Sequence, residues 1–236
     1  MKLGVNIDHV ATLRQVRGGA WPDPAAAARI CERAGAHAVV MHLREDRRHI
    51  QDEDLFRVQK AVSLKLNMEM SIAPSVVKTA MRLGPDQVTL VPEKRKERTT
   101  EGGLDLFKKP QTLRRVVEDF KKRGIEVSLF IDPDLKQIDG AKKLGVPAVE
   151  FHTGDYANQT SAPGAGRELL RLEKAVKAAG ERGITPHAGH GLDYDNVKAV
   201  KKMEGLSELN IGYSIVCRAV WVGFENAVKE MLHLIQ

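Results

Sequence analysis

The chain has 236 residues, of which 42% are hydrophobic and 29% charged, and a formal net charge of +6. This balance is ordinary for a folded domain and excludes a disordered chain. Only 5% of the residues are aromatic, and the basic residues are interspersed with acids, which argues against a nucleic-acid-binding surface. The positive charge fits small anionic substrates such as sugar phosphates.

Two further features of the composition concern compartment and redox state. Cys31 and Cys217 lie in apolar, helix-like contexts without metal-ligand spacing, and we interpret both as buried reduced thiols. The sequence shows neither a secretory signal nor an apolar run of membrane-spanning length. We therefore expect a cytoplasmic protein without a membrane or nucleic-acid partner.

Short apolar runs alternate with amphipathic segments along the whole chain. The runs, rich in Val, Ile and Leu, predict strands at 2–8, 38–43, 66–70, 87–92, 126–132, 148–153, 184–190 and 208–213. The amphipathic segments between them, typical of helices, cover 23–35, 53–63, 74–84, 112–124, 134–145, 166–183, 194–203 and 214–236.

Glycine and proline mark the ends of these segments. Glycines that can adopt the left-handed conformation follow several predicted helices, at Gly35, Gly84, Gly124, Gly145 and Gly183. Prolines stand where helices are expected to begin, at Pro24, Pro74 and Pro133. About eight strand–helix units predict an α/β fold, a single-domain (β/α)8 TIM barrel over residues 1–236 with extra helical segments. A doubly wound sheet is the alternative, but no glycine-rich dinucleotide turn follows the first strand.

In five of the predicted strands, polar residues stand two positions apart and therefore on the same face. The pairs are Asn6 and Asp8, His42 and Arg44, Asn67 and Glu69, Glu150 and His152, and Asn210 and Gly212. Alternate strand residues face opposite sides, so these pairs are expected to face the barrel interior while apolar neighbours face the helices. Buried carboxylates and imidazoles are costly unless they are paired or face a solvated pocket. The repetition over five strands predicts an active site at the carboxyl ends of the strands.

Glycines follow the last two predicted strands, in "HAGHGLD" (187–193) and "LNIGYS" (209–214). Such glycines, next to helix N-termini, commonly form a phosphate site in this fold. Arg17 and Arg44 could add charge-assisted contacts, so two phosphorylated substrates are conceivable.

Three residues could transfer protons near neutral pH: His42, Glu69 and His190. Asp8, His9, His42, Glu69 and His190 could in principle hold a metal, but the sequence lacks metal-ligand spacing, so we expect none. The long polar segment at 91–105 is expected to contain a lid, closing at 94–103.

Two other functions stay open on the residues alone. A sugar-phosphate isomerase or aldolase would keep the barrel, and a Schiff-base lysine within a strand would favour it, but the predicted strands contain only Lys2. A basic nucleic-acid-binding protein is supported only by the net charge.

A set of motifs in fixed order resembles the pyridoxine 5′-phosphate synthase family. The motifs are "GVNIDHVATLRQVRG", "HLREDRRHI", "NMEM", "VPEKR", "TTEGG", "VSLFID", "HTG", "AGHGL" and "LNIG". The resemblance implies a barrel that condenses 1-deoxy-D-xylulose 5-phosphate with 3-amino-2-oxopropyl phosphate to pyridoxine 5′-phosphate, phosphate and water. It also implies a cytoplasmic octamer built from dimers, without an organic cofactor.

The resemblance further implies roles for individual residues. His42 and Glu69 would accept protons and His190 would donate one, with Glu150 in the same polar mouth. The aminoketone phosphate would be held by Asn6, Arg17, Gly191, Gly212 and Tyr213. The deoxyxylulose phosphate would be held by Asp8, His9, Arg44, His49 and Thr99. Tyr213 departs from the family pattern, in which histidine follows the glycine, so a side-chain role for an imidazole there is in doubt.

Overall fold

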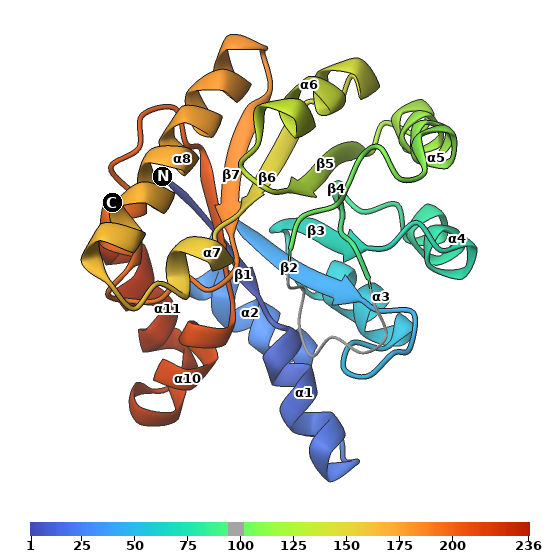
Figure 1. Cartoon of the computed structure of the whole chain (residues 1–236). Coiled ribbons are helices and arrows are strands. Elements are labelled where there is room, and N and C mark those ends of the chain that lie inside the picture. Colours follow the sequence, from blue (N-terminus) through green and yellow to red (C-terminus); the bar gives the residue numbers. More distant parts are fainter. Residues whose placement is uncertain (94–101) are drawn as a thin grey trace.

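The computed structural model describes residues 1–93 and 102–236, and its strands form a closed parallel barrel in sequence order, with β1 next to β8 (Figure 1). This confirms the (β/α)8 barrel and excludes the doubly wound sheet. The strands are β1 (Lys2–Asn6), β2 (Ala38–Leu43), β3 (Lys65–Met70), β4 (Gln87–Leu90), β5 (Glu126–Ile131), β6 (Ala148–His152), β7 (Thr185–Gly189) and β8 (Glu208–Ile211).

The helices surround the barrel, and α1 projects away from it (Figure 1). They are α1 (Asp8–Arg17), α2 (Pro24–Ala34), α3 (Asp52–Ala61), α4 (Pro74–Leu83), α5 (Pro110–Lys122), α6 (Leu135–Leu144), α7 (Gly154–Ala157), α8 (Ala162–Glu181), α9 (Val197–Val200), α10 (Tyr213–Val222) and α11 (Phe224–Ile235). The barrel thus carries extra helical segments, as expected: α1 precedes α2 after β1, the short α7 precedes α8 after β6, and two helices, α10 and α11, follow β8.

The alternation of side chains along the strands separates an apolar shell from a polar interior. Met68 and Met70 of β3 are fully buried in the hydrophobic core between strands and helices. Asn67, on the opposite face of the same strand, points inward, where its Oδ1 accepts a hydrogen bond from Thr89 Oγ1 at 2.8 Å. Elsewhere in the barrel interior, Asn210 donates to Glu150 Oε2 at 2.7 Å. The predicted polar interior is therefore confirmed for these strands.

Most of the predicted helix boundaries are confirmed. Gly35, Gly84 and Gly145 cap α2, α4 and α6 in the left-handed conformation, which a residue with a Cβ adopts only at a cost. Pro24 and Pro74 are the first residues of α2 and α4. Pro133 does not start a helix: Asp134 caps α6 by accepting the Lys136 N–H, and the helix begins at Leu135.

The first predicted strand was too long. β1 ends at Asn6, and Asp8 is the first residue of α1, which the sequence did not reveal as a helix. The Asn6 side chain accepts the backbone N–H of Asp8 at 2.9 Å and so satisfies a donor at the start of the helix. α1 was missed because its sequence, DHVATLRQVR, is polar on average and carries only a weak apolar stripe.

The interpretation of the cysteines is half right. Cys31 is buried in the core, where burial raises the pKa of its thiol to about 12, whereas Cys217 is exposed on α10. The apolar sequence around Cys217 suggested burial, but Val220 and Trp221 nearby are exposed as well. Within residues 1–93 and 102–236, none of the helices has the length and apolar character needed to span a bilayer.

Candidate active site

A cavity of about 910 Å³ opens at the carboxyl ends of the strands. Its floor includes Asn6, His42, Glu69, Glu150 and Asn210, which come from five strands. A volume near the upper end of the range for small-molecule sites is enough for two small substrates. The location is the one that barrel enzymes use for catalysis.

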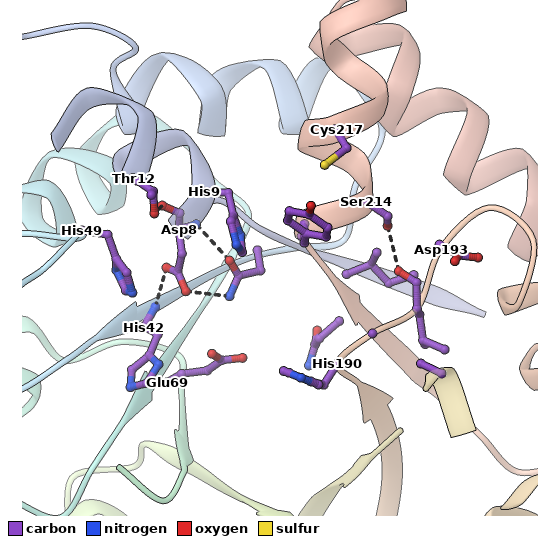
Figure 2. Close-up of a pocket in the computed structure, with 18 of the residues that line it drawn as sticks. Asp8, His9, Thr12, His42, His49, Glu69, His190, Asp193, Ser214 and Cys217 are labelled. Carbon is purple, nitrogen blue, oxygen red and sulfur yellow. Dashed lines mark hydrogen bonds between the residues drawn. The ribbon is translucent and has the colours of Figure 1, made fainter. Parts of the chain in front are cut away.

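Asp8 organises one side of this cavity. Its Oδ1 accepts the backbone N–H of His42 at 2.8 Å, and its Oδ2 accepts the Asn6 amide at 3.0 Å (Figure 2). The start of α1 is thereby tied to β2. Because both oxygens already have donors, Asp8 is held in one orientation facing the cavity.

His42 and Glu69 are direct neighbours on paired strands, β2 and β3. Both lie on the cavity floor, with Glu69 between His42 and His190 in the view of Figure 2. Burial, the largest cause, lowers the pKa of His42 to about 4, so its imidazole is neutral at pH 7 and able to accept a proton.

Glu69 and Glu150 form an acidic pair at the floor. Burial and then the charges of Glu150 and Asp8 raise the pKa of Glu69 well above its usual range. Burial raises the pKa of Glu150 to about 8, against the hydrogen bond from Asn210, which lowers it. Both carboxyls therefore hold a proton more tightly than an exposed glutamate does, so they can give or take one during a reaction.

His190 faces Glu69 across the cavity (Figure 2). Burial, followed by the charges of His152 and His9, lowers the pKa of His190 to about 4. The following Gly191 has φ +77°, and a Cβ there would lie 2.6 Å from that of Ala157. Only glycine fits this turn.

The N-terminus of α10 faces the same cavity. Gly212 caps this ten-residue helix, and a Cβ at Gly212 would lie 2.7 Å from the carbonyl oxygen of Asn6. The close approach brings the first amides of α10 to the cavity, where a phosphate group could accept hydrogen bonds. Tyr213, the first helical residue, contacts the His9 ring at a centroid distance of 5.1 Å.

The segment after β2 contributes positive charge to the cavity. Arg44 is buried and lines the cavity, and its Nη2 lies 3.6 Å from Glu93 Oε1. Glu93 also accepts the backbone N–H of Glu45, which fixes this segment against the end of β4. His49 lies on the same wall, with its ring centroid 6.1 Å from that of His42.

The structure brings most of the predicted site residues together. The cavity is lined by Asn6, Asp8, His9, His42, Arg44, His49, Glu69, His190, Gly191, Gly212 and Tyr213. Arg17 does not line it: this exposed residue ends α1, a full helix length from Asp8. Thr99 lies outside the described residues, as do residues 94–101 of the predicted lid at 94–103.

Several cavity residues were missed in the sequence. Cys217, Arg218 and Trp221 line one wall, and they come from α10. The sequence offered a signal in the long apolar stretch after Gly212, but this stretch was interpreted only as part of an amphipathic helix, with Cys217 buried. Arg48 was also overlooked among its charged neighbours.

The expectation of no metal rested on spacing in the sequence, although Asp8, His42 and Glu69 were among the residues considered as possible ligands, and the fold brings these three together. One candidate ligand atom each from Asp8, His42 and Glu69 lies within 4.8 Å of the others. Carboxylates and an imidazole suit a divalent cation, but the same groups suit shared protons.

The buried acidic pair predicts a dependence of stability on pH. Glu150 titrates at about 8 in the folded protein and near 4.5 when unfolded, so between these values the folded state holds the extra proton. Stability from this residue therefore falls as pH rises from 4.5 to 8. We expect Glu150→Gln to become progressively more stable than wild type over that range in thermal unfolding. If the melting temperatures of the two proteins change in parallel with pH, this expectation is contradicted. Glu173→Gln, at an exposed position on α8, serves as the control.

A closed barrel with imidazoles and carboxylates gathered at the carboxyl ends of its strands defines an enzyme of acid–base chemistry on small anionic substrates. The family profile described as "Pyridoxal phosphate biosynthesis protein PdxJ" matches residues 3–236. The chain therefore belongs to this family.

Curated relatives and a solved structure agree with this placement. The chain is 50% identical over 233 residues to the pyridoxine 5′-phosphate synthase of Syntrophotalea carbinolica, covering 99% of this chain and 98% of the relative. It is 49% identical to that of Pelobacter propionicus, covering 100% and 98%. A solved 4-hydroxy-2-oxoglutarate aldolase/2-deydro-3-deoxyphosphogluconate aldolase from TTHB1 has a TM-score of 0.64 at 16% identity, over 99% of this chain and 94% of that one. The last similarity concerns the fold alone.

Proposed function

We propose that the chain is a pyridoxine 5′-phosphate synthase, which condenses 1-deoxy-D-xylulose 5-phosphate with 3-amino-2-oxopropyl phosphate. The observation that carries the proposal is the meeting of His42, Glu69 and His190 in one cavity of a chain that matches the family over its whole length. The products are pyridoxine 5′-phosphate, phosphate and water, and the pathway is vitamin B6 biosynthesis.

The proposed chemistry needs several proton transfers in one pocket. Amine and ketone form an imine, protons leave carbon, water and phosphate depart, and an aldol-type step closes the ring. His42 is neutral at pH 7 and can accept a proton. The raised pKa of Glu69 makes its carboxylate a stronger base than an exposed one. His190, on the opposite side, acts as the proton donor after it has taken up a proton. Glu150 supports Glu69, because its negative charge raises the pKa of Glu69.

The two phosphates are assigned to two neighbouring sets of cavity residues. Asn6, Gly191, Gly212 and Tyr213 would hold the aminoketone phosphate at the N-terminus of α10, where amide donors gather. Asp8, His9, Arg44, His49 and Thr99 would hold the deoxyxylulose phosphate. Tyr213 stands where the family pattern has histidine, and its backbone amide at the helix start suffices for a phosphate contact.

Arg17 fits this scheme only through a second copy of the chain. It is exposed at the end of α1, close to exposed apolar side chains at Leu13, Val16 and Trp21. Val220 and Trp221 of α10 are exposed too. These apolar surfaces support a homo-oligomer, for which we propose an octamer built from dimers, in the cytoplasm.

Lys65, a lysine within a strand, does not support the aldolase alternative. Lys65 is a strand lysine that the predicted boundaries missed, since β3 begins one residue early. It lies at the amino end of the strand, opposite the cavity, with its Nζ 3.4 Å from Glu126 Oε2. A Schiff base there would not meet the acid–base groups.

Incubating the purified protein with both phosphorylated substrates, and measuring pyridoxine 5′-phosphate by mass and absorbance, tests the proposal. We expect product only when both substrates are present. Absence of product, or product from one substrate alone, would refute the function.

We expect no loss of activity on removal of divalent ions, and no requirement for an organic cofactor. Both oxygens of Asp8 already accept hydrogen bonds, which leaves the Asp8, His42 and Glu69 cluster poorly suited to a tightly held ion. Turnover after dialysis against EDTA measures this. Complete loss, restored by one divalent ion, would show that the cluster binds a catalytic metal.

A further inference from the structure

His152, at the carboxyl end of β6, is a buried imidazole that stands beside a cavity residue. It is 4% exposed, and its ring centroid lies 5.0 Å from that of His190 with an interplanar angle of 46°. Phe130 packs edge-on against the same ring at 5.4 Å. The His152 ring is thus confined between a cavity-lining phenyl ring and the proposed proton donor.

Asp132, just after β5, lies beside the Nδ1 nitrogen of His152. Its Oδ1 lies 3.5 Å from His152 Nδ1 and accepts the backbone N–H of Gly103 at 2.8 Å. The interaction with His152 is the largest cause that lowers the pKa of Asp132, so the carboxylate is ionised near neutral pH. An ionised carboxylate next to Nδ1 favours the tautomer with the proton on that nitrogen.

Both ring nitrogens of His152 are buried, and neither has a hydrogen-bond partner among the described residues. With the proton on Nδ1, beside Asp132, Nε2 carries the free lone pair. A Cβ at Gly154 would lie 2.5 Å from this Nε2 and 3.1 Å from His190 Cδ2. Because Gly154 has no Cβ, the rings of His152 and His190 have room to contact each other.

Thr153 holds the backbone of His190. His190 has φ +80°, a conformation that costs energy for any residue with a Cβ. The Thr153 hydroxyl lies 2.6 Å from the carbonyl oxygen of His190 and 2.8 Å from that of Gly189. The Thr153 N–H also donates to the Gly189 carbonyl at 2.9 Å. These contacts stabilise the strained turn.

We propose that His152 and Thr153 are positioning residues for His190, with Asp132 fixing the tautomer of His152. The inference rests on the proposed function, in which His190 transfers a proton. His152 orients the His190 ring and Thr153 its backbone. The charged neighbours are His152 and His9 around His190, and Arg171 beside Asp132.

The test compares kcat, KM and the pH profile of variants in the two-substrate assay. Asp132→Asn removes the negative charge that favours the proton on Nδ1 of His152, while its amide oxygen can still accept the Gly103 N–H. We expect kcat to fall by roughly 10- to 100-fold, less than the 10²–10⁴-fold typical of losing a proton-transfer group, with KM unchanged within about threefold. Asp155→Asn is the control, because Asp155 is an exposed partner of Arg171 on the same side of the barrel.

Two further variants separate positioning from folding. Thr153→Val removes the hydroxyl at constant shape and should lower kcat similarly, while Thr153→Ser should retain it. His152→Gln removes a group that lowers the pKa of His190 whenever it is protonated, so the limb of the kcat profile controlled by His190 should move to higher pH. If Asp132→Asn does not fold, the kinetics of the Thr153 and His152 variants test the proposal instead.

The variant His190→Asn distinguishes the proposed function from the positioning role. Near-normal turnover of His190→Asn would remove the proposed role of His190, and the inference with it. If His190→Asn is inactive but the Asp132, His152 and Thr153 variants keep wild-type kcat and pH profile, only the inference is overturned. A loss that appears as raised KM or a lowered melting temperature would likewise assign these residues a structural role and overturn it.

Discussion

Replacing Glu69 with glutamine should abolish most turnover while leaving a folded protein that binds both substrates. Glutamine keeps the shape of the side chain but cannot accept the proton. Loss of a general base typically costs about 10²–10⁴-fold in rate. The phosphates are assigned to other residues, so KM should change little. Steady-state kinetics on Glu69→Gln, with binding of each substrate measured by calorimetry, tests this expectation.

The matched control is Glu208→Gln. Glu208 is also buried, and burial raises its pKa as well, but it starts β8 at the amino end of the barrel and does not line the cavity. The same chemical change there should leave kcat nearly unaltered. If Glu69→Gln turns over at a near-normal rate, Glu69 is a structural polar residue and His42 becomes the first candidate for the base.

Replacing Arg14 with leucine should cause the largest loss of stability among single charge changes on α1. Arg14 and Asp54 form a buried two-point ion pair at 2.6 and 2.7 Å, which ties α1 to α3, and Arg14 also donates to the His49 carbonyl at 3.1 Å. Removing one partner leaves the other charge buried without compensation, at a cost of about 3–5 kcal/mol. Urea unfolding of Arg14→Leu measures the loss.

Two comparisons make this prediction specific. Arg33→Leu removes an arginine whose contact with Glu225, at 3.4 Å, is solvent-exposed, and exposed pairs contribute at most about 1 kcal/mol. The double variant Arg14→Leu with Asp54→Leu should recover part of the stability, because no uncompensated charge remains. A loss below about 1 kcal/mol for Arg14→Leu alone would show that the pair is not a significant support of α1.

The barrel itself was predictable from the sequence because its signals are local. Alternation along a strand is a property of consecutive residues, so strand parity alone assigns Asn67 and Glu69 to the interior and Met68 and Met70 to the core. Helix ends at Gly35, Gly84 and Gly145 follow from the backbone freedom of glycine. The motifs that indicated the family are also short runs of consecutive residues, so they too could be recognised without the structure.

Other features depended on contacts between distant segments. α1 begins at Asp8 because the Asn6 side chain and the His42 backbone hold it there, and its own residues show little helical periodicity. The exposure of Cys217 is set by how α10 lies on the barrel, which its apolar sequence does not specify.

The candidate site likewise has features that the sequence predicted and features that only the structure revealed. Residue type and strand parity were enough to identify the groups that could carry protons, His42, Glu69 and His190. The closed barrel was needed to show that Glu69 and Glu150 share a desolvated floor, that Asp132 and His152 stand behind His190, and that Arg17 lies away from the cavity. Closing the barrel brings together residues far apart in the chain, and burial and neighbouring charges then set their pKa values, which no local pattern encodes.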